Sequence, residues 1–147
     1  MIDFSQLSDT QIVQFVDEHF ELFANDRYEG FPGNVLSRLD RDIFSIIRRP
    51  EGFAFAFKGR RYLSSPGGFA ADLIFLYVLP EYEGHGIGTA LVEEIKISVT
   101  PGVPVKLKCE GTRRKAFFGR LGFDVTKYWE DGDLYEMQWN ASAPDAA

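Results

Sequence analysis

The sequence reads EYEGHGIGTAL over residues 81–91, and this stretch decides the fold. Gly84, Gly86 and Gly88 alternate here, directly after an apolar segment and directly before residues with helical spacing. Glycines between a strand and a helix let the backbone approach a ligand, and N–H groups at a helix N-terminus attract anions. The loop therefore predicts a phosphate-binding turn, although Glu83 puts an acid where a phosphate site would favour a cation.

The elements around this loop follow from hydrophobic spacing and turn residues. A capping box at residues 8–11 precedes a helix predicted over residues 12–23. A second helix is predicted from six apolar residues and ends at Pro50: Val35, Leu36, Leu39, Ile43, Ile46 and Ile47. Strands are predicted at residues 53–57, 71–79, 103–109, 123–129 and 134–139, and further helices at residues 87–99 and 112–121, the last capped by Thr112. Residues 64–68, SSPGG, predict a turn.

Length and composition predict one soluble domain. The chain has 147 residues, of which 1–140 are expected to form the domain and 141–147 a disordered tail. A lone cysteine, the absence of a secretory pattern and an apolar run too short to cross a bilayer favour the cytoplasm. The net charge is -6, and the acidic excess lies in residues 1–37. Such a surface disfavours nucleic acid and attracts cationic molecules.

The loop also bears a resemblance to a known family. Residues 77–91 resemble the acetyl-CoA motif of the GNAT superfamily of N-acetyltransferases, and Arg120-Leu-Gly-Phe123, after Phe117 and Phe118, is similar to that family's second signature. The element order agrees from about Phe4 to Trp139, whereas a dinucleotide fold would place its loop after the first strand. The resemblance implies an α/β (mixed α+β) fold: a twisted mixed sheet of six to seven strands, flanked by about four helices, with a splayed central strand pair.

The resemblance implies acetyl-CoA as co-substrate and no metal. A backbone N–H near Leu76 or Val78 would polarise the thioester carbonyl. The basic triplet Arg113, Arg114 and Lys115 is either a phosphate contact or a solvated helix start. The residues implied to bind acetyl-CoA are Leu76, Tyr77, Val78, Leu79, Glu83, Gly84, His85, Gly86, Ile87, Gly88, Thr89, Arg114 and Phe117.

Catalytic groups are less determined by the sequence. Asp72 and Glu110 are equal candidates for the general base, with His85 a weaker one. Phe118 stands where many family members carry the tyrosine that protonates the leaving thiolate, and phenylalanine cannot donate a proton. A tyrosine elsewhere (Tyr77, Tyr82 or Tyr128) or a water molecule could substitute. Cys109 is interpreted as a small apolar strand residue rather than a nucleophile.

The acceptor is predicted from charge. In such folds the first two helices and the loop between them wall the acceptor side, and here that segment carries Asp17, Glu21, Asp26 and Glu29. We therefore expect direct attack by a primary amine, either of a cationic small molecule or of a peptide. The alternative is a catalytically weak acyl-CoA-binding regulatory module, whereas acetylation of charged tRNA is disfavoured by the acidic surface. No nucleic-acid or membrane partner is expected, and a homodimer through edge strands stays open.

Overall fold

The computed structural model describes residues 2–23, 31–61, 69–99 and 102–140. Its strands are β1 (Phe44–Arg49), β2 (Gly52–Arg61), β3 (Phe69–Val78), β4 (Val105–Glu110), β5 (Asp124–Trp129) and β6 (Leu134–Trp139). Its helices are α1 (Asp9–Glu18), α2 (Gly33–Leu36), α3 (Ile87–Ser98) and α4 (Thr112–Arg120), with 3-10 turns η1 (Phe4–Gln6), η2 (Phe20–Phe23), η3 (Leu39–Arg41) and η5 (Pro80–Tyr82).

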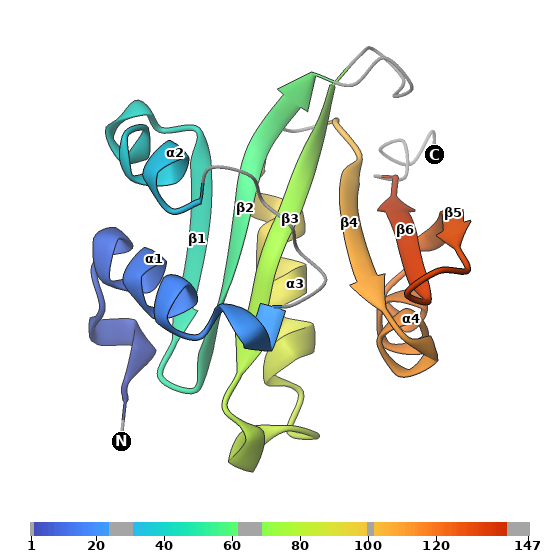
Figure 1. Ribbon diagram of the computed structural model, residues 1–147, viewed down its shortest axis with the longest axis horizontal. Helices are drawn as coiled ribbons and strands as arrows, with labels where there is room; N and C mark the ends of the chain where they lie inside the picture. The colour runs from blue at the N-terminus through green and yellow to red at the C-terminus, as the bar shows by residue number, and fades with distance from the viewer. Residues whose placement is uncertain (1, 24–30, 62–68, 100–101, 141–147) are drawn as a thin grey trace, which may run out of the picture.

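The strands of the described residues form one six-stranded sheet with the order β1-β2-β3-β4-β6-β5. The central pair β3 and β4 is parallel, and the other neighbouring pairs are antiparallel. The connection from β3 to β4 therefore passes through α3, which lies behind the sheet in Figure 1. This arrangement confirms the mixed α+β sheet expected from the sequence.

Two hydrophobic layers cover opposite faces of the sheet. On one face, α1 packs with η1 and η2 against β2 and β3, and its apolar stripe includes Ile12, Val13 and Val16, all fully buried. On the other face, α3 and α4 share a second cluster with β3, β4 and β6. Figure 1 shows α1 in front of the half of the sheet formed by β1, β2 and β3, and α2 beside β1. No helix in the described ranges is long and apolar enough to span a membrane.

The predicted second helix is wrong over most of its length. Only Gly33–Leu36 is α-helical, and Phe44–Arg49 is the edge strand β1, paired with β2. Ile46 and Ile47 pack against opposite faces of the sheet, which adjacent residues do in a strand. Asp42 adopts a left-handed conformation just before the strand and breaks helical continuity. The spacing of the apolar residues fits both patterns, so it could not separate them.

Smaller differences concern element ends. The capping box is confirmed, since Ser8 and Gln11 bond reciprocally, but α1 ends at Glu18 and a 3-10 turn continues to Phe23. Thr112 is the first residue of α4 rather than its cap, which is Gly111. The predicted turn at residues 64–68 and the tail at residues 141–147 lie outside the described residues.

Gly52 provides a test of the close approach between β2 and β3. A Cβ at Gly52 would lie 2.1 Å from the carbonyl oxygen of Tyr77, so a side chain there must push the strands apart. We expect Gly52→Ala to lower the free energy of unfolding by about 1–3 kcal/mol, as overpacking does. Urea unfolding followed by far-UV circular dichroism would measure this change.

Gly119 supplies the matched control. It lies in α4, where an added Cβ meets nothing within 4 Å. Gly119→Ala should leave stability unchanged or raise it by up to about 1 kcal/mol, the difference in helix propensity. Equal destabilisation by both substitutions would contradict the assigned register.

Candidate active site

The central parallel pair of strands separates partway along its length. Three register pairs join β3 to β4: Ala71 with Val105, Asp72 with Lys106 and Leu73 with Leu107. Beyond these pairs, β3 continues to Val78 and β4 to Glu110, and in the described part of the chain the two strands do not pair with each other again. Figure 1 shows them diverging. We call this separation the fork. It confirms the predicted splayed strand pair.

A β-bulge lies at the fork. The register with β2 passes from Phe55 opposite Phe75 to Ala56 opposite Leu73, so Ile74 is the extra residue. Past this point, backbone N–H and C=O groups of β3 that face β4 have no ladder partner in that strand. Such groups are available to an extended ligand that lies along β3 as an additional strand would.

The glycine loop leads from the end of β3 into α3. Gly84 and Gly86 have φ values of +82° and +81°, in the left-handed region that favours glycine. Gly86 is the N-cap of α3 and makes no side-chain capping bond, so the first N–H groups of the helix stay available to an anion. The loop geometry therefore fits a phosphate group.

The fork and the loop open into one cavity of about 870 Å³. Its walls come from η2, the C-terminal half of β3, the glycine loop, the start of α3, the end of β4 and one face of α4. The sequence-predicted residues that line it are Leu76, Tyr77, Val78, Glu83, Gly84, Gly86, Ile87, Gly88, Thr89, Glu110, Arg114, Phe117 and Phe118.

Other predicted site residues lie elsewhere. Leu79 and His85 do not line this cavity, and Asp72 lies on β3 in register with Lys106. Asp17 and Glu21 are exposed on α1 and η2. Asp26 and Glu29 fall outside the described residues.

The cavity also includes Arg120, Leu22 and Phe23, which were not predicted to bind the cofactor, and Arg113, for which the sequence left a phosphate contact and a solvated helix start open. Arg113 and Arg120 of α4 line it, at positions four before and three after Phe117, so all three share one helical face. That spacing could have identified Arg120 from the sequence. Leu22 and Phe23 of η2 also line it, but their positions depend on tertiary packing, which the sequence pattern does not reveal.

Charge is unevenly placed around the cavity. Four basic residues line it, Lys108, Arg113, Arg114 and Arg120, together with the two acids Glu83 and Glu110.

Burial raises the pKa of Tyr77, and the charges of Glu83 and Glu81 raise it further. The Tyr77 hydroxyl is therefore protonated at neutral pH and can donate a hydrogen bond. Glu83 is exposed and faces the cleft rather than turning fully away from it.

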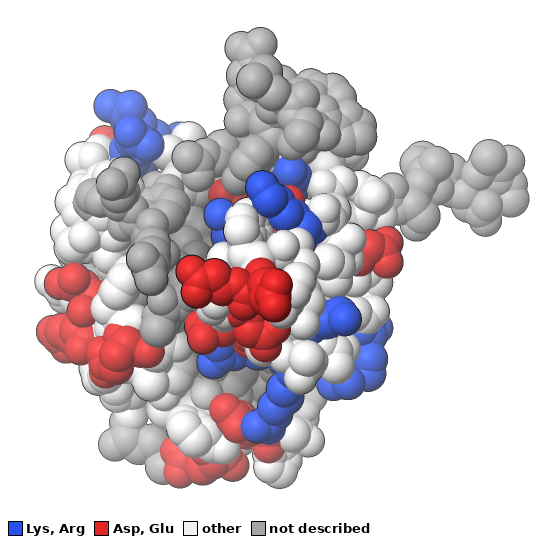
Figure 2. All heavy atoms as spheres, turned by 45° about the vertical axis from the view of Figure 1, so that its right-hand side comes forward, with Lys and Arg blue, Asp and Glu red and all other residues white. Residues whose placement is uncertain are grey.

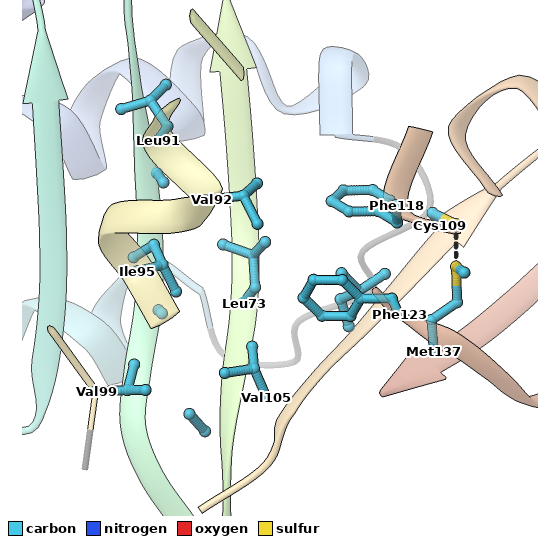
Figure 3. Packing of buried hydrophobic residues seen from close by; sticks show 14 of the residues in the cluster. Leu73, Leu91, Val92, Ile95, Val99, Val105, Cys109, Phe118, Phe123 and Met137 are labelled. Carbon is cyan, nitrogen blue, oxygen red and sulfur yellow. Dashed lines mark hydrogen bonds between the residues drawn. The ribbon is translucent and has the colours of Figure 1, made fainter. Parts of the chain in front are cut away.

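Cys109 lines the cavity at the fork, but it is not an accessible nucleophile. It is 1% exposed, and its Sγ–H donates to Met137 Sδ at 3.7 Å (Figure 3). Burial raises its pKa to about 11, although the positive charge of Arg114 acts in the opposite direction. A thiol with that pKa carries almost no thiolate near neutral pH, which supports its interpretation as a small apolar residue.

The same region gives no sign of a metal site. Among the residues that the structure describes, no group of three or more His, Cys, Asp or Glu side chains is arranged to hold a metal ion.

Comparison with known proteins identifies the family. The acetyltransferase (GNAT) domain profile matches residues 43–125, more than half of the chain. The chain therefore belongs to the GNAT acetyltransferase family, whose members transfer an acetyl group from acetyl-CoA. The match spans β1 to the start of β5 and includes the fork, the glycine loop and α4. None of the curated proteins matches the chain in sequence.

Solved structures share the fold at low sequence identity. A structure described as histone acetyltransferase HPA2 and related acetyltransferase from Corynebacterium glutamicum is 18% identical with a TM-score of 0.62, over 95% of this chain and 96% of that one. Arabidopsis thaliana Naa50, in complex with the bisubstrate analogue CoA-Ac-MVNAL, is 16% identical with a TM-score of 0.60, over 92% and 95%. A GNAT-family structure from Desulfovibrio desulfuricans is 21% identical with a TM-score of 0.52, over 63% of this chain, which spans 62% of that protein's length.

Glu83 offers a test of the cavity's electrostatics. Its carboxylate lines the part of the cleft next to the glycine loop, where it would repel a bound phosphate. We expect Glu83→Gln to lower the Kd for acetyl-CoA about 2- to 5-fold, the range for one solvent-screened charge. Isothermal titration calorimetry at low ionic strength would measure it, and added salt should reduce the difference.

Glu81→Gln is the matched control for this measurement. Glu81 is an exposed acid of the same loop but does not line the cavity. Its neutralisation should change the Kd by less than about 1.5-fold, since a charge farther from the ligand is screened more strongly. Equal tightening by both substitutions would show only a general charge effect and would contradict the placement of phosphate beside Glu83.

Proposed function

We propose that the protein transfers an acetyl group from acetyl-CoA to a primary amine by direct attack of that amine on the thioester. The observation that carries this proposal is the joining of the fork and the glycine loop in one cavity. The loop and the N-terminus of α3 supply N–H donors for phosphate, and the unpaired segment of β3 supplies backbone groups for an extended arm. Family membership and the coenzyme A analogue bound by the Arabidopsis neighbour support the same donor.

The basic face of α4 supports the placement of the donor. Arg113, Arg114 and Arg120 line the same cavity as the glycine loop, so both guanidinium groups and helix N–H groups would be available to the negative phosphates of coenzyme A. The sequence left a phosphate contact and a solvated helix start open for the basic triplet, and the position of Arg114 in the cavity wall favours the phosphate contact. Lys115, in contrast, does not line the cavity, and its Nζ lies 5.2 Å from the ring centroid of Tyr135.

Direct attack is favoured over an acetyl-enzyme intermediate because Cys109 is buried and protonated. The attacking amine must lose a proton, and Glu110 is the candidate base that lines the cavity. Asp72 stays a candidate at the closed side of the fork, beside Lys106 in the register. Tyr77 and Tyr82 both line the cavity and bring hydroxyl groups to it, whereas Phe118 brings none.

Charge placement supports a cationic acceptor. Leu22 and Phe23 of η2 line the cavity, and the exposed acids Asp17 and Glu21 lie on or just before the same turn. Figure 2 shows acidic side chains gathered at the left-hand edge of the view and again near its middle. A polyamine-like or aminoglycoside-like molecule, or a lysine or N-terminal amine of a peptide, has the charge that such acids attract.

A panel of amines with acetyl-CoA would test this proposal, with release of free coenzyme A thiol as the readout. We expect turnover of cationic amines, and we expect joint neutralisation of Asp17, Glu21, Asp26 and Glu29 to raise the acceptor KM about 3- to 10-fold. The reason is the loss of attraction between a cation and several acids, each worth a few tenths of a kcal/mol when exposed. An unchanged KM across the panel would contradict the assignment of these acids to the acceptor.

A specific observation favours a second candidate, a weakly catalytic acyl-CoA-binding module. Phe118 lines the cavity at the position of the usual acid but has no proton to donate, and Glu83 opposes phosphate. The two candidates differ in what Phe118→Tyr should do. If the protein is an enzyme and the coenzyme A thiolate leaves unaided or is protonated by another hydroxyl, Phe118→Tyr should change the rate of thiol release by less than about 3-fold. A gain of about 100-fold or more, the effect of a restored general acid, would favour the module instead.

A further inference from the structure

The two adjacent phenylalanines of α4 lie side by side in the cavity wall, with their ring centroids 5.0 Å apart. A Cβ on Gly88 would come within 3.3 Å of the Phe117 ring and 3.8 Å of Val78, so Phe117 lies against the glycine loop and the end of β3. Phe118 is 7% exposed and packs against Phe123, with ring centroids 5.7 Å apart. Figure 3 shows its ring directed from α4 toward Leu73 and Val92, across the gap between β4 and β3.

The course of β3 indicates which part of the cavity would receive an acyl group. The strand β3 runs from Leu73 at the fork to Val78 before the glycine loop, a span of about 17 Å. With the phosphates at the loop, an extended pantetheine arm along this segment would carry its thioester to the fork. The acyl group then lies near Leu73, toward which the Phe118 ring is directed, and beyond the contact of Phe117 with the glycine loop.

The fork end is closed and apolar. Its walls are Leu73, Ile74, Leu107, Cys109 and Phe118, whose exposed fractions lie between 1% and 7%. Behind the Phe118 ring the cluster continues without a break through Phe123 and Val92, at 2% and 0% exposure. A longer acyl chain could enter this end only by displacing packed side chains, and protein cores resist such displacement.

We propose that Phe118 is the residue that limits the acyl group to acetyl, by closing the fork end of the cavity. The inference rests on the proposed function, because it takes acyl-CoA as the ligand. Phe118 stands at the position of the usual proton donor but has no hydroxyl. Its ring sets the depth of the acyl site and keeps water from the thioester. Each further methylene on the donor meets the ring.

The test compares acetyl-, propionyl- and butyryl-CoA binding by calorimetry in the full chain. We expect the wild type to bind butyryl-CoA at least 10-fold more weakly than acetyl-CoA, because butyryl carries two extra methylenes and a single one costs about 10- to 200-fold in a fitted pocket. Phe118→Leu shortens the side chain and should reduce this difference to about 3-fold or less. Phe118→Tyr keeps the ring and should keep the selectivity of the wild type.

Phe123→Leu is the matched control, because Phe123 belongs to the same packed cluster but does not line the cavity. It should leave the butyryl-to-acetyl ratio unchanged, and urea unfolding of each variant separates loss of structure from altered selectivity. Equal affinity of the wild type for acetyl- and butyryl-CoA, or an equal relaxation by Phe123→Leu, would overturn the assignment of Phe118 while leaving the proposed function intact. Failure of the wild type to bind any of the three ligands would overturn both.

Discussion

The structure depends on one interruption of hydrogen bonding, the end of the β3–β4 ladder at Leu73 and Leu107. A parallel sheet normally satisfies its backbone groups through its neighbours, so strands that part in the middle of a sheet leave polar groups to be satisfied by something else. The bulge at Ile74 lies one residue past the last pair and changes which face each later side chain meets. Leu73 therefore belongs to the layer of α3, whereas Phe75 packs in the layer of α1.

An open fork requires that the two halves of the sheet be joined by other means. The helices α3 and α4 supply the join: Lys96 of α3 donates to the carbonyl oxygen of Leu121 at 2.6 Å, and its Nζ lies 4.8 Å from the ring centroid of Trp139. The contact of Phe117 with Gly88 fixes α4 against the loop from the other side. The cavity is thus held open by helix packing, so the walls that bind a ligand are also the walls that keep the sheet together.

Much of this could be predicted from the sequence, and the successes and failures have physical causes. The glycine loop, α3, β4 and α4 have strong local signals, because turn glycines and a single helical or alternating period specify each of them. The segment at residues 43–47 does not, since its apolar residues fit two periods and only pairing with β2 decides between them. Leu22, Phe23 and the closed end at Phe118 depend on contacts between segments far apart in the chain, and no local pattern encodes those contacts.

The two departures from the family pattern have different physical weight. Glu83 is exposed, so water screens its repulsion of phosphate, and the N–H groups of the loop act independently of its side chain. Phe118 is buried in a continuous apolar cluster, where a hydroxyl would need a hydrogen-bond partner that the neighbouring rings and aliphatic side chains do not offer. The fork end therefore favours a ring without a hydroxyl. The proposed proton transfers are then left to the polar residues that line the cavity, among them Tyr77, Tyr82 and Glu110.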